Sequence, residues 1–147
     1  MISSFSCRTQ LYTNYGRFRR ACELLVLTGN SLVIRLGPMF GGNRKKDMLH
    51  DILACRKVYA AAGTRYAYVD VAWAGQKIVD LLKEERIGIQ EIGARNDVSL
   101  GDIAKHFNSK SLFEGIIEHQ LTKKFSDGPD ANEVYIYAEK EFQCLIK

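Results

Sequence analysis

The sequence reads Tyr15-Gly-Arg-Phe-Arg-Arg-Ala-Cys-Glu-Leu-Leu-Val-Leu-Thr-Gly-Asn-Ser-Leu-Val-Ile-Arg-Leu36 over the stretch that decides its fold. Apolar residues of the first part recur at helical spacing, and Gly29-Asn30 supplies a stop signal, which predicts a helix over 15–28. The next residues are rich in β-branched side chains and end at Gly37-Pro38, which predicts a buried strand over 31–36. A helix that leads directly into a strand is the basic unit of an α/β protein.

The same order of elements repeats along the chain. Helical spacing predicts helices over 47–61 and 72–83, and strand-like runs occupy 66–71 and 87–92. The sequence Ser99-Leu-Gly-Asp102 fits a capping box that opens a helix to about Asn108. A short run from Ile2 to Ser6 is consistent with one more strand. We therefore predict an α/β fold with a mainly parallel sheet and flanking helices.

The last forty residues carry weaker patterns. We predict a helix over 111–125, a loop over 126–131 with strong turn chemistry, and a strand over 133–138. No internal repeat and no low-complexity segment interrupts the chain. We expect residues 1–147 to form one domain, since this length suits a single core.

Composition excludes several functional classes. The 21 basic and 17 acidic residues give a net charge of +4 and are interleaved, so we expect no nucleic-acid partner. No run of about 18 apolar residues could span a bilayer, and the start lacks the apolar core of a signal peptide. The four cysteines form no C-x-x-C pair and the three histidines have no metal-ligand spacing. We expect a cytoplasmic protein with reduced thiols, no membrane partner and no metal.

Five short motifs occur in a fixed order. The first is Ile2-Ser3-Ser4 at a strand end, and the second is Tyr15-Gly-Arg-Phe-Arg19-Arg-Ala-Cys-Glu23. The third is Val33-Ile-Arg-Leu-Gly-Pro38-Met-Phe-Gly41. The last two are Tyr68-Val-Asp-Val-Ala72, and Ile92-Gly93 followed by Val98-Ser-Leu100.

Together these motifs resemble the extended short-chain dehydrogenases of the sugar-nucleotide epimerase, dehydratase and reductase type. The second motif is similar to the signature Y-G-x-x-K-x-x-x-E of that family, with Arg19 in place of the lysine. The likeness covers about residues 1–107 and implies the carboxyl-terminal half of a truncated Rossmann-like fold; residues 108–147 match no family landmark. The glycine-rich turn that holds the dinucleotide is absent, because the Gly37–Gly42 cluster does not have its spacing.

The resemblance implies a proton exchange with a sugar hydroxyl or carbonyl. Tyr15 would be the exchanging phenol, Ser4 or Ser3 would orient the substrate, and Arg19 would supply the positive charge that such a phenol needs. Arg19 and Pro38 would contact NAD or NADP. The planar fork of arginine cannot reproduce the compact lysine contact of the family. In the alternative interpretation these residues have structural roles only. Tyr15 begins a helix, Arg19 lies on the solvated face of that helix, and Ser3 and Ser4 end a strand.

Two functions remain open. In the first, the chain is a degenerate, non-catalytic binding or assembly module; in the second, it is the catalytic and substrate half of a split nucleotide-sugar oxidoreductase. Arg44 and Lys45 would bind a nucleotide-sugar pyrophosphate through their positive charge. Alternatively, they belong to an ordinary solvated surface. Without the preceding half, one side of the Ile2–Ser6 strand is unpaired. We therefore expect a homodimer or a protein partner at this strand or at the Tyr15 helix.

Overall fold

The computed structural model describes residues 1–42, 47–122 and 127–145. Its main sheet has the strand order β1-β2-β6 and is parallel throughout. These strands are Ile2–Ser4, Leu32–Leu36 and Gly88–Ile92. β1 therefore has a neighbour on one side only among the described strands.

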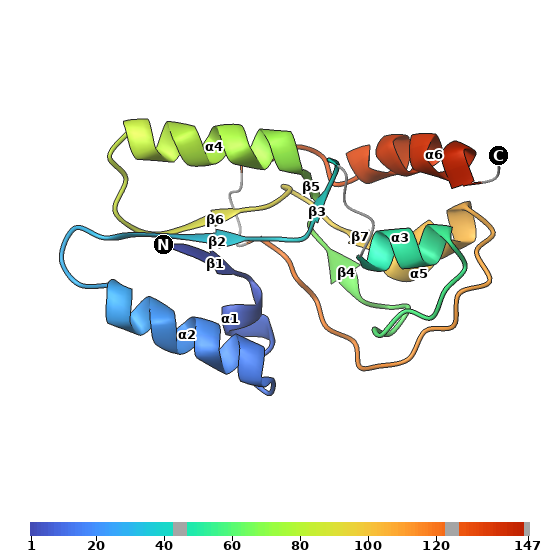
Figure 1. Ribbon diagram of the computed structural model, residues 1–147, viewed down its shortest axis with the longest axis horizontal. Helices are drawn as coiled ribbons and strands as arrows, with labels where there is room; N and C mark the ends of the chain where they lie inside the picture. Colours follow the sequence, from blue (N-terminus) through green and yellow to red (C-terminus); the bar gives the residue numbers. More distant parts are fainter. Residues whose placement is uncertain (43–46, 123–126, 146–147) are drawn as a thin grey trace.

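Helices cover both faces of this sheet (Figure 1). α1 (Ser6–Thr9) and α2 (Asn14–Val26) lie on one side, and α4 (Val71–Lys83) lies on the other. The predicted α/β fold with a mainly parallel sheet and flanking helices is confirmed. None of the helices in the described ranges is long and apolar enough to cross a membrane.

A second group of elements lies beyond the carboxyl end of β2 (Figure 1). It contains two small sheets: β3 (Met39–Phe40) pairs in parallel with β5 (Val69–Asp70), and β4 (Arg65–Tyr66) pairs antiparallel with β7 (Val98–Ser99). Three helices pack around them: α3 (Met48–Leu53), α5 (Leu100–His106) and α6 (Glu133–Leu145). Buried apolar residues from both groups join in one hydrophobic core.

Several predicted elements are confirmed with small changes of boundary. α2, β2, α4 and β6 lie where helical spacing and β-branched runs predict them. The N-cap at the start of α5 is also confirmed, because the Ser99 hydroxyl accepts a hydrogen bond from the Asp102 amide at 3.1 Å. The predicted strand over 66–71 is instead two short strands, β4 and β5, in different sheets. The chain changes sheets at Ala67 and Tyr68, which belong to neither strand.

The predicted helix over 47–61 is wrong after residue 53. α3 ends at Leu53, and Cys55 follows with a positive φ of 53°. Beyond it the backbone pairs with a distant segment: the Val58 amide donates to the Leu112 carbonyl at 2.9 Å. The predicted helix over 111–125 is wrong over 111–122 for the same reason, and 123–125 lie outside the described residues. Hydrogen bonds between the two segments replace those within a helix.

The predicted strand over 133–138 is wrong, because these residues begin α6. The residues Ala131, Val134 and Ala138 are fully buried, at the three- and four-residue spacing of a helix face, whereas Ile136 is exposed. The Asp130 carboxylate accepts a hydrogen bond from the Asn132 amide at 2.8 Å, which satisfies one backbone donor just before the helix.

Replacing Val134 tests this packing. We expect Val134→Ala to lower the free energy of unfolding by about 2 kcal/mol, because it leaves a cavity beneath α6. The matched control is Ile136→Ala, which should change the free energy by less than about 0.5 kcal/mol since its side chain is exposed. Urea unfolding measures both. Equal effects for the two variants would contradict the helical face described for α6.

Candidate functional site

The start of α2 is fixed by two local features. The Thr13 hydroxyl caps the helix by accepting a hydrogen bond from the Gly16 amide at 3.0 Å. A Cβ atom at Gly16 would lie 2.1 Å from the Gln10 carbonyl oxygen, so a glycine is needed where α1 and the helix start meet. These contacts set the position of Tyr15 in the first turn of α2.

The structure brings Tyr15 and Arg19 together, as their spacing of four residues predicts. Arg19 Nε donates to the Tyr15 hydroxyl at 3.3 Å, and the guanidinium carbon lies 5.3 Å from the ring centroid. Arg19 Nη1 donates in addition to the carbonyl oxygen of Ile2 at 3.3 Å. Arg19 therefore links the Tyr15 phenol to the backbone of strand β1.

Ser4 is not joined to this pair. Its hydroxyl donates to the Ser6 hydroxyl at 3.3 Å and accepts from the Ser6 amide at 3.3 Å. No hydrogen bond connects Ser4 with Tyr15 or Arg19 within the described parts of the chain. Ser3, the other serine considered, is buried and lies opposite Arg35 in the sheet.

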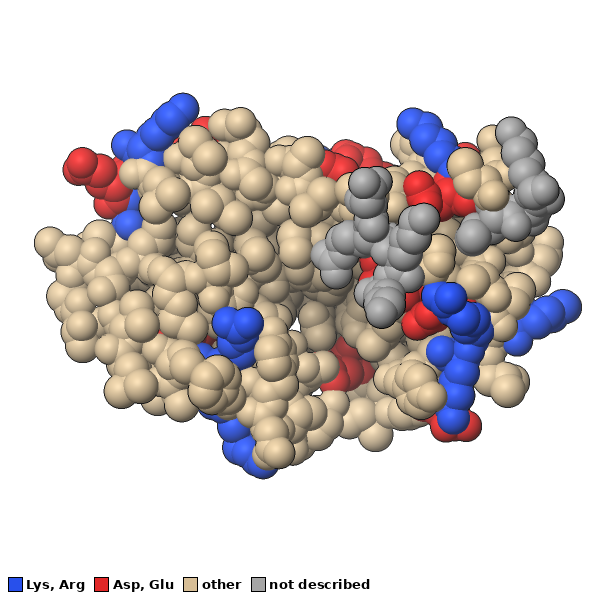
Figure 2. Space-filling model, viewed as in Figure 1, with Lys and Arg blue, Asp and Glu red and all other residues tan. Residues whose placement is uncertain are grey.

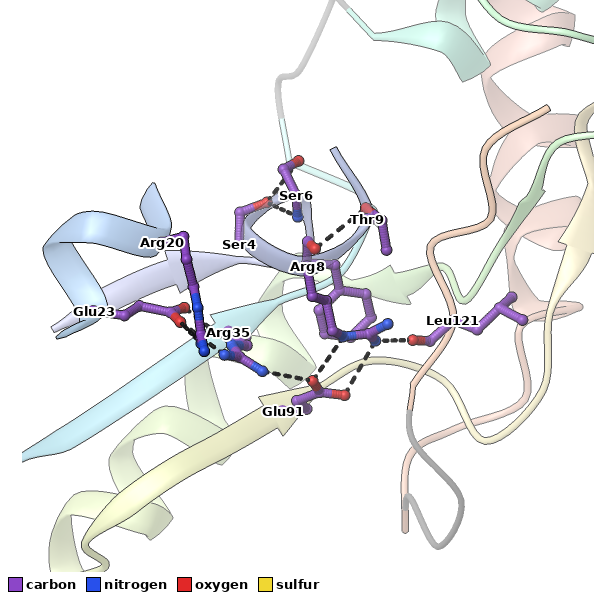
Figure 3. Close-up of polar contacts among 10 residues, drawn as sticks. Ser4, Ser6, Arg8, Thr9, Arg20, Glu23, Arg35, Glu91 and Leu121 are labelled. Atoms are coloured by element: carbon purple, nitrogen blue, oxygen red, sulfur yellow. Dashed lines mark hydrogen bonds and ion pairs between the residues drawn. The ribbon is translucent and has the colours of Figure 1, made fainter. Parts of the chain in front are cut away.

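A chain of charged side chains lies between α2 and the sheet (Figure 3). Arg35 forms a bidentate ion pair with Glu23, in which Nε donates to Oε1 at 3.0 Å and Nη2 donates to Oε2 at 2.7 Å. Arg35 Nη1 also donates to Glu91 Oε1 at 3.4 Å. Arg8 also donates to Glu91, from Nε to Oε1 at 2.9 Å and from Nη2 to Oε2 at 3.2 Å. Its Nη2 donates in addition to the Leu121 carbonyl oxygen. We call these four residues, Arg8, Glu23, Arg35 and Glu91, the charged network.

Burial and the charged network shift the ionisation of its members. Burial alone would raise the pKa of the Glu23 carboxyl, but Arg35 and the neighbouring Cys7 outweigh it and lower the pKa to about 2. Burial, together with the Glu23 carboxylate, raises the pKa of the Cys7 thiol to about 11. Glu23 is therefore a carboxylate and Cys7 a neutral thiol at neutral pH, so neither is suited to exchange protons there.

The other predicted site residues are Pro38, Arg44 and Lys45. Pro38 lies between β2 and β3, and its carbonyl accepts from the Val69 amide at 3.1 Å. Arg44 and Lys45 lie outside the described residues. No three His, Cys, Asp or Glu side chains of the described ranges gather where they could hold a metal ion.

The turn from β1 to α1 does not fit the pyrophosphate of NAD or NADP. Such a group is normally held by a glycine-rich turn between a strand and a helix, with the helix amides directed at it. β1 passes into α1 through Phe5 without a glycine, and α1 has only four residues. Arg19, the predicted cofactor contact, is already bound to Tyr15 and to the Ile2 carbonyl.

A groove of about 440 Å³ opens between the segment that joins α1 to α2 and the second group of elements. Tyr12, Tyr59, Tyr66 and Glu118 contribute the aromatic and charged part of its lining. Sequence reasoning missed this groove, because the residues come from segments far apart in the chain. On the face of the molecule seen in Figure 2, basic and acidic side chains are scattered among other residues.

Solved structures with the same fold were found by comparison. One is a UDP-galactose 4-epimerase, with a TM-score of 0.68 and 15% identity over 98% of this chain. A second is a UDP-N-acetylglucosamine 4-epimerase from Methanobrevibacter ruminantium M1, in complex with UDP-N-acetylmuramic acid. Its TM-score is 0.71, with 10% identity over 99% of this chain. A third is a dTDP-glucose 4,6-dehydratase from Bacillus anthracis, in complex with NAD, with a TM-score of 0.70 and 12% identity over 97% of this chain.

The fold of this chain is therefore Rossmann-like. More specifically, it is the fold of nucleotide-sugar epimerases and dehydratases, which confirms at the level of fold the resemblance carried by the five motifs. The chain spans 63%, 62% and 61% of the lengths of these three proteins. No protein-family model matches the sequence, and no curated protein matches it.

The charged network predicts a pH-dependent stability. Replacing Glu23 by Gln should lower the free energy of unfolding at pH 7 by about 3 kcal/mol, because Arg35 loses a buried partner. The folded pKa of Glu23, about 2, lies below its ordinary value of 4.5, so this stabilisation is full above pH 4.5 and is lost as pH falls toward 2. The difference between the wild type and Glu23→Gln should therefore shrink at low pH, as measured by urea unfolding.

The control is the exposed pair of Glu84 and Arg86, whose side chains meet at 2.8 Å. Glu84→Gln should change the free energy of unfolding by less than about 0.5 kcal/mol, since solvent screens exposed pairs. A Glu23→Gln chain as stable as Glu84→Gln at pH 7 would show that the network does not hold α2 in place.

Proposed function

We propose that this chain is a binding and assembly module with the fold of nucleotide-sugar epimerases and dehydratases, and that it is not catalytic on its own. The observation that carries the proposal is an apolar surface on α2 beside the open edge of β1. Tyr15, Phe18 and Leu25 are 49%, 66% and 79% exposed and are spaced so that they follow one side of the helix. Exposed apolar side chains that lie together on one surface are typical of interaction sites, and we infer one here.

The helix surface and the strand edge are contiguous. Arg19 of α2 reaches the carbonyl of Ile2 in β1, and Ile2 itself is 45% exposed. An open strand edge can be covered by a further strand, and an apolar helix side by another helix. We propose a second copy of this chain as the occupant, because a two-fold axis at this surface would cover edge and helix at once.

The arginines beside the surface make hydrogen bonds within the chain. Arg17 donates to the Asn14 side chain at 2.6 Å, and Arg19 is held by Tyr15 and by Ile2. Their guanidinium groups are thus already bound within the chain. We further propose a cytoplasmic location, supported by four cysteines that are all free thiols.

The contact between Arg19 and the Tyr15 hydroxyl favours a second candidate function. In this alternative, the chain is the catalytic and substrate half of a split nucleotide-sugar oxidoreductase. Tyr15 would exchange a proton with a sugar hydroxyl, and the dinucleotide would be held by another subunit. Against it stand the position of Ser4, which is bonded to Ser6, and the turn from β1 to α1, which has no glycine to hold a phosphate.

Cofactor titration separates the two candidates. NADH and NADPH are added to the purified chain, and the fluorescence of the nicotinamide is followed. We expect no saturable binding up to millimolar cofactor, because the turn from β1 to α1 has no glycine and leads into a helix of only four residues. Saturable binding at micromolar cofactor would contradict the non-catalytic proposal and would make the oxidoreductase the leading candidate.

A further inference from the structure

Backbone groups of β1 point alternately toward β2 and away from it. The Met1 carbonyl accepts a hydrogen bond from the Ile34 amide at 2.9 Å, and the Phe5 amide donates to β2 at 3.0 Å. Because successive residues of a strand direct these groups to opposite sides, the amides and carbonyls of Ile2 and Ser4 point away from β2. We call these four groups the outer edge of β1; no described strand pairs with them.

Arg19 covers one group of this outer edge. Its Nη1 donates to the Ile2 carbonyl oxygen at 3.3 Å, and its Nε donates to the Tyr15 hydroxyl at 3.3 Å. The guanidinium carbon also lies 5.3 Å from the centroid of the Tyr15 ring, which is within the range of a cation–π contact. The planar guanidinium thus binds two acceptors at once, one in the strand and one in the helix.

The outer edge is short. β1 has three residues, and the chain turns into α1 at Phe5, which has helical φ and ψ angles of −55° and −25°. The Ser4 hydroxyl accepts a hydrogen bond from the Ser6 amide at 3.3 Å within this turn. An added strand therefore meets only the groups of Ile2 and Ser4, and Arg19 already binds the Ile2 carbonyl. Short edge strands and charged side chains at the edge both prevent strand pairing in natural sheets.

A strand laid on this edge would bury the charge of Arg19. None of the ion pairs within the described ranges includes Arg19, because the carboxylate one turn further along α2, Glu23, is bound to Arg20 and Arg35 at 3.4 and 2.7 Å. Residues 1–9 contain no Asp or Glu, so the β1 strand of a second copy would bring no carboxylate to this position. Burying a guanidinium among neutral partners costs free energy, and moving it aside breaks its hydrogen bond to the strand.

We propose that Arg19 blocks the pairing of a further strand with β1, so that two copies associate through side chains and without strand pairing. This inference deepens the proposed association and rests on it for the second copy. A chain whose edge also paired would have two separate association surfaces, a helix and a strand edge, and would link more than two copies. Arg19 thus limits the assembly to a closed pair.

The test compares Arg19→Ala with the wild type by sedimentation velocity at several micromolar concentrations. We expect the variant to reach about twice the weight-average mass of the wild type or more, because its strand edge pairs with other copies. Hydrogen exchange identifies the contact: the Ser4 amide should exchange about tenfold more slowly in the variant, since an added strand would bond to it. A variant that keeps the wild-type mass, or that grows without protection of the Ser4 amide, would overturn the proposal.

Two further variants separate this role from general effects of mutation. Arg17→Ala is the matched control and should keep the wild-type mass, because this exposed arginine binds Asn14 and the Tyr12 carbonyl and not the strand. Adding Ser4→Pro to Arg19→Ala removes an amide of the outer edge and should restore the wild-type mass. Growth that persists in this double variant would contradict the proposal. A wild type that sediments as a single chain contradicts the proposed association, but the comparison with Arg19→Ala still tests the block.

Discussion

The bidentate ion pair between Glu23 and Arg35 is the constraint on which the rest of the structure depends. It joins α2 to the central strand of the sheet, and Glu91 and Arg8 extend it to β6 and α1. Removing one partner of a buried pair is costly because the other charge remains unsolvated. The network therefore fixes α2, and with it the position of Tyr15 and the apolar surface beside β1.

The sequence predicted the first half of this architecture well, because periodicity and turn residues dominate there. The helix over 15–28 and the strand over 31–36 follow from local pattern, as does the cap at Ser99. That Glu23 and Arg35 meet could not be read from spacing, since they lie in different elements. The errors at 54–61 and 111–122 share one cause: two segments pair with each other, which no local pattern reveals.

The candidate site was predicted in part for the same reason. Tyr15 and Arg19 share a helix face, so their contact follows from helical geometry alone. The position of Ser4 depends on how β1 turns into α1, and the turn directs its bonds to Ser6. The groove needs Tyr12, Tyr59 and Tyr66 from three segments. Only the folded chain shows that its described lining has no basic residue.

The proposed assembly of this chain depends on the surface of α2 that the charged network positions. Sedimentation equilibrium at micromolar concentration tests it most directly, with the wild type and Phe18→Glu compared in one buffer. The account predicts that the wild type has twice the chain mass of 16.6 kDa and that Phe18→Glu has the chain mass itself. A wild-type chain that stays at 16.6 kDa would contradict the assembly role.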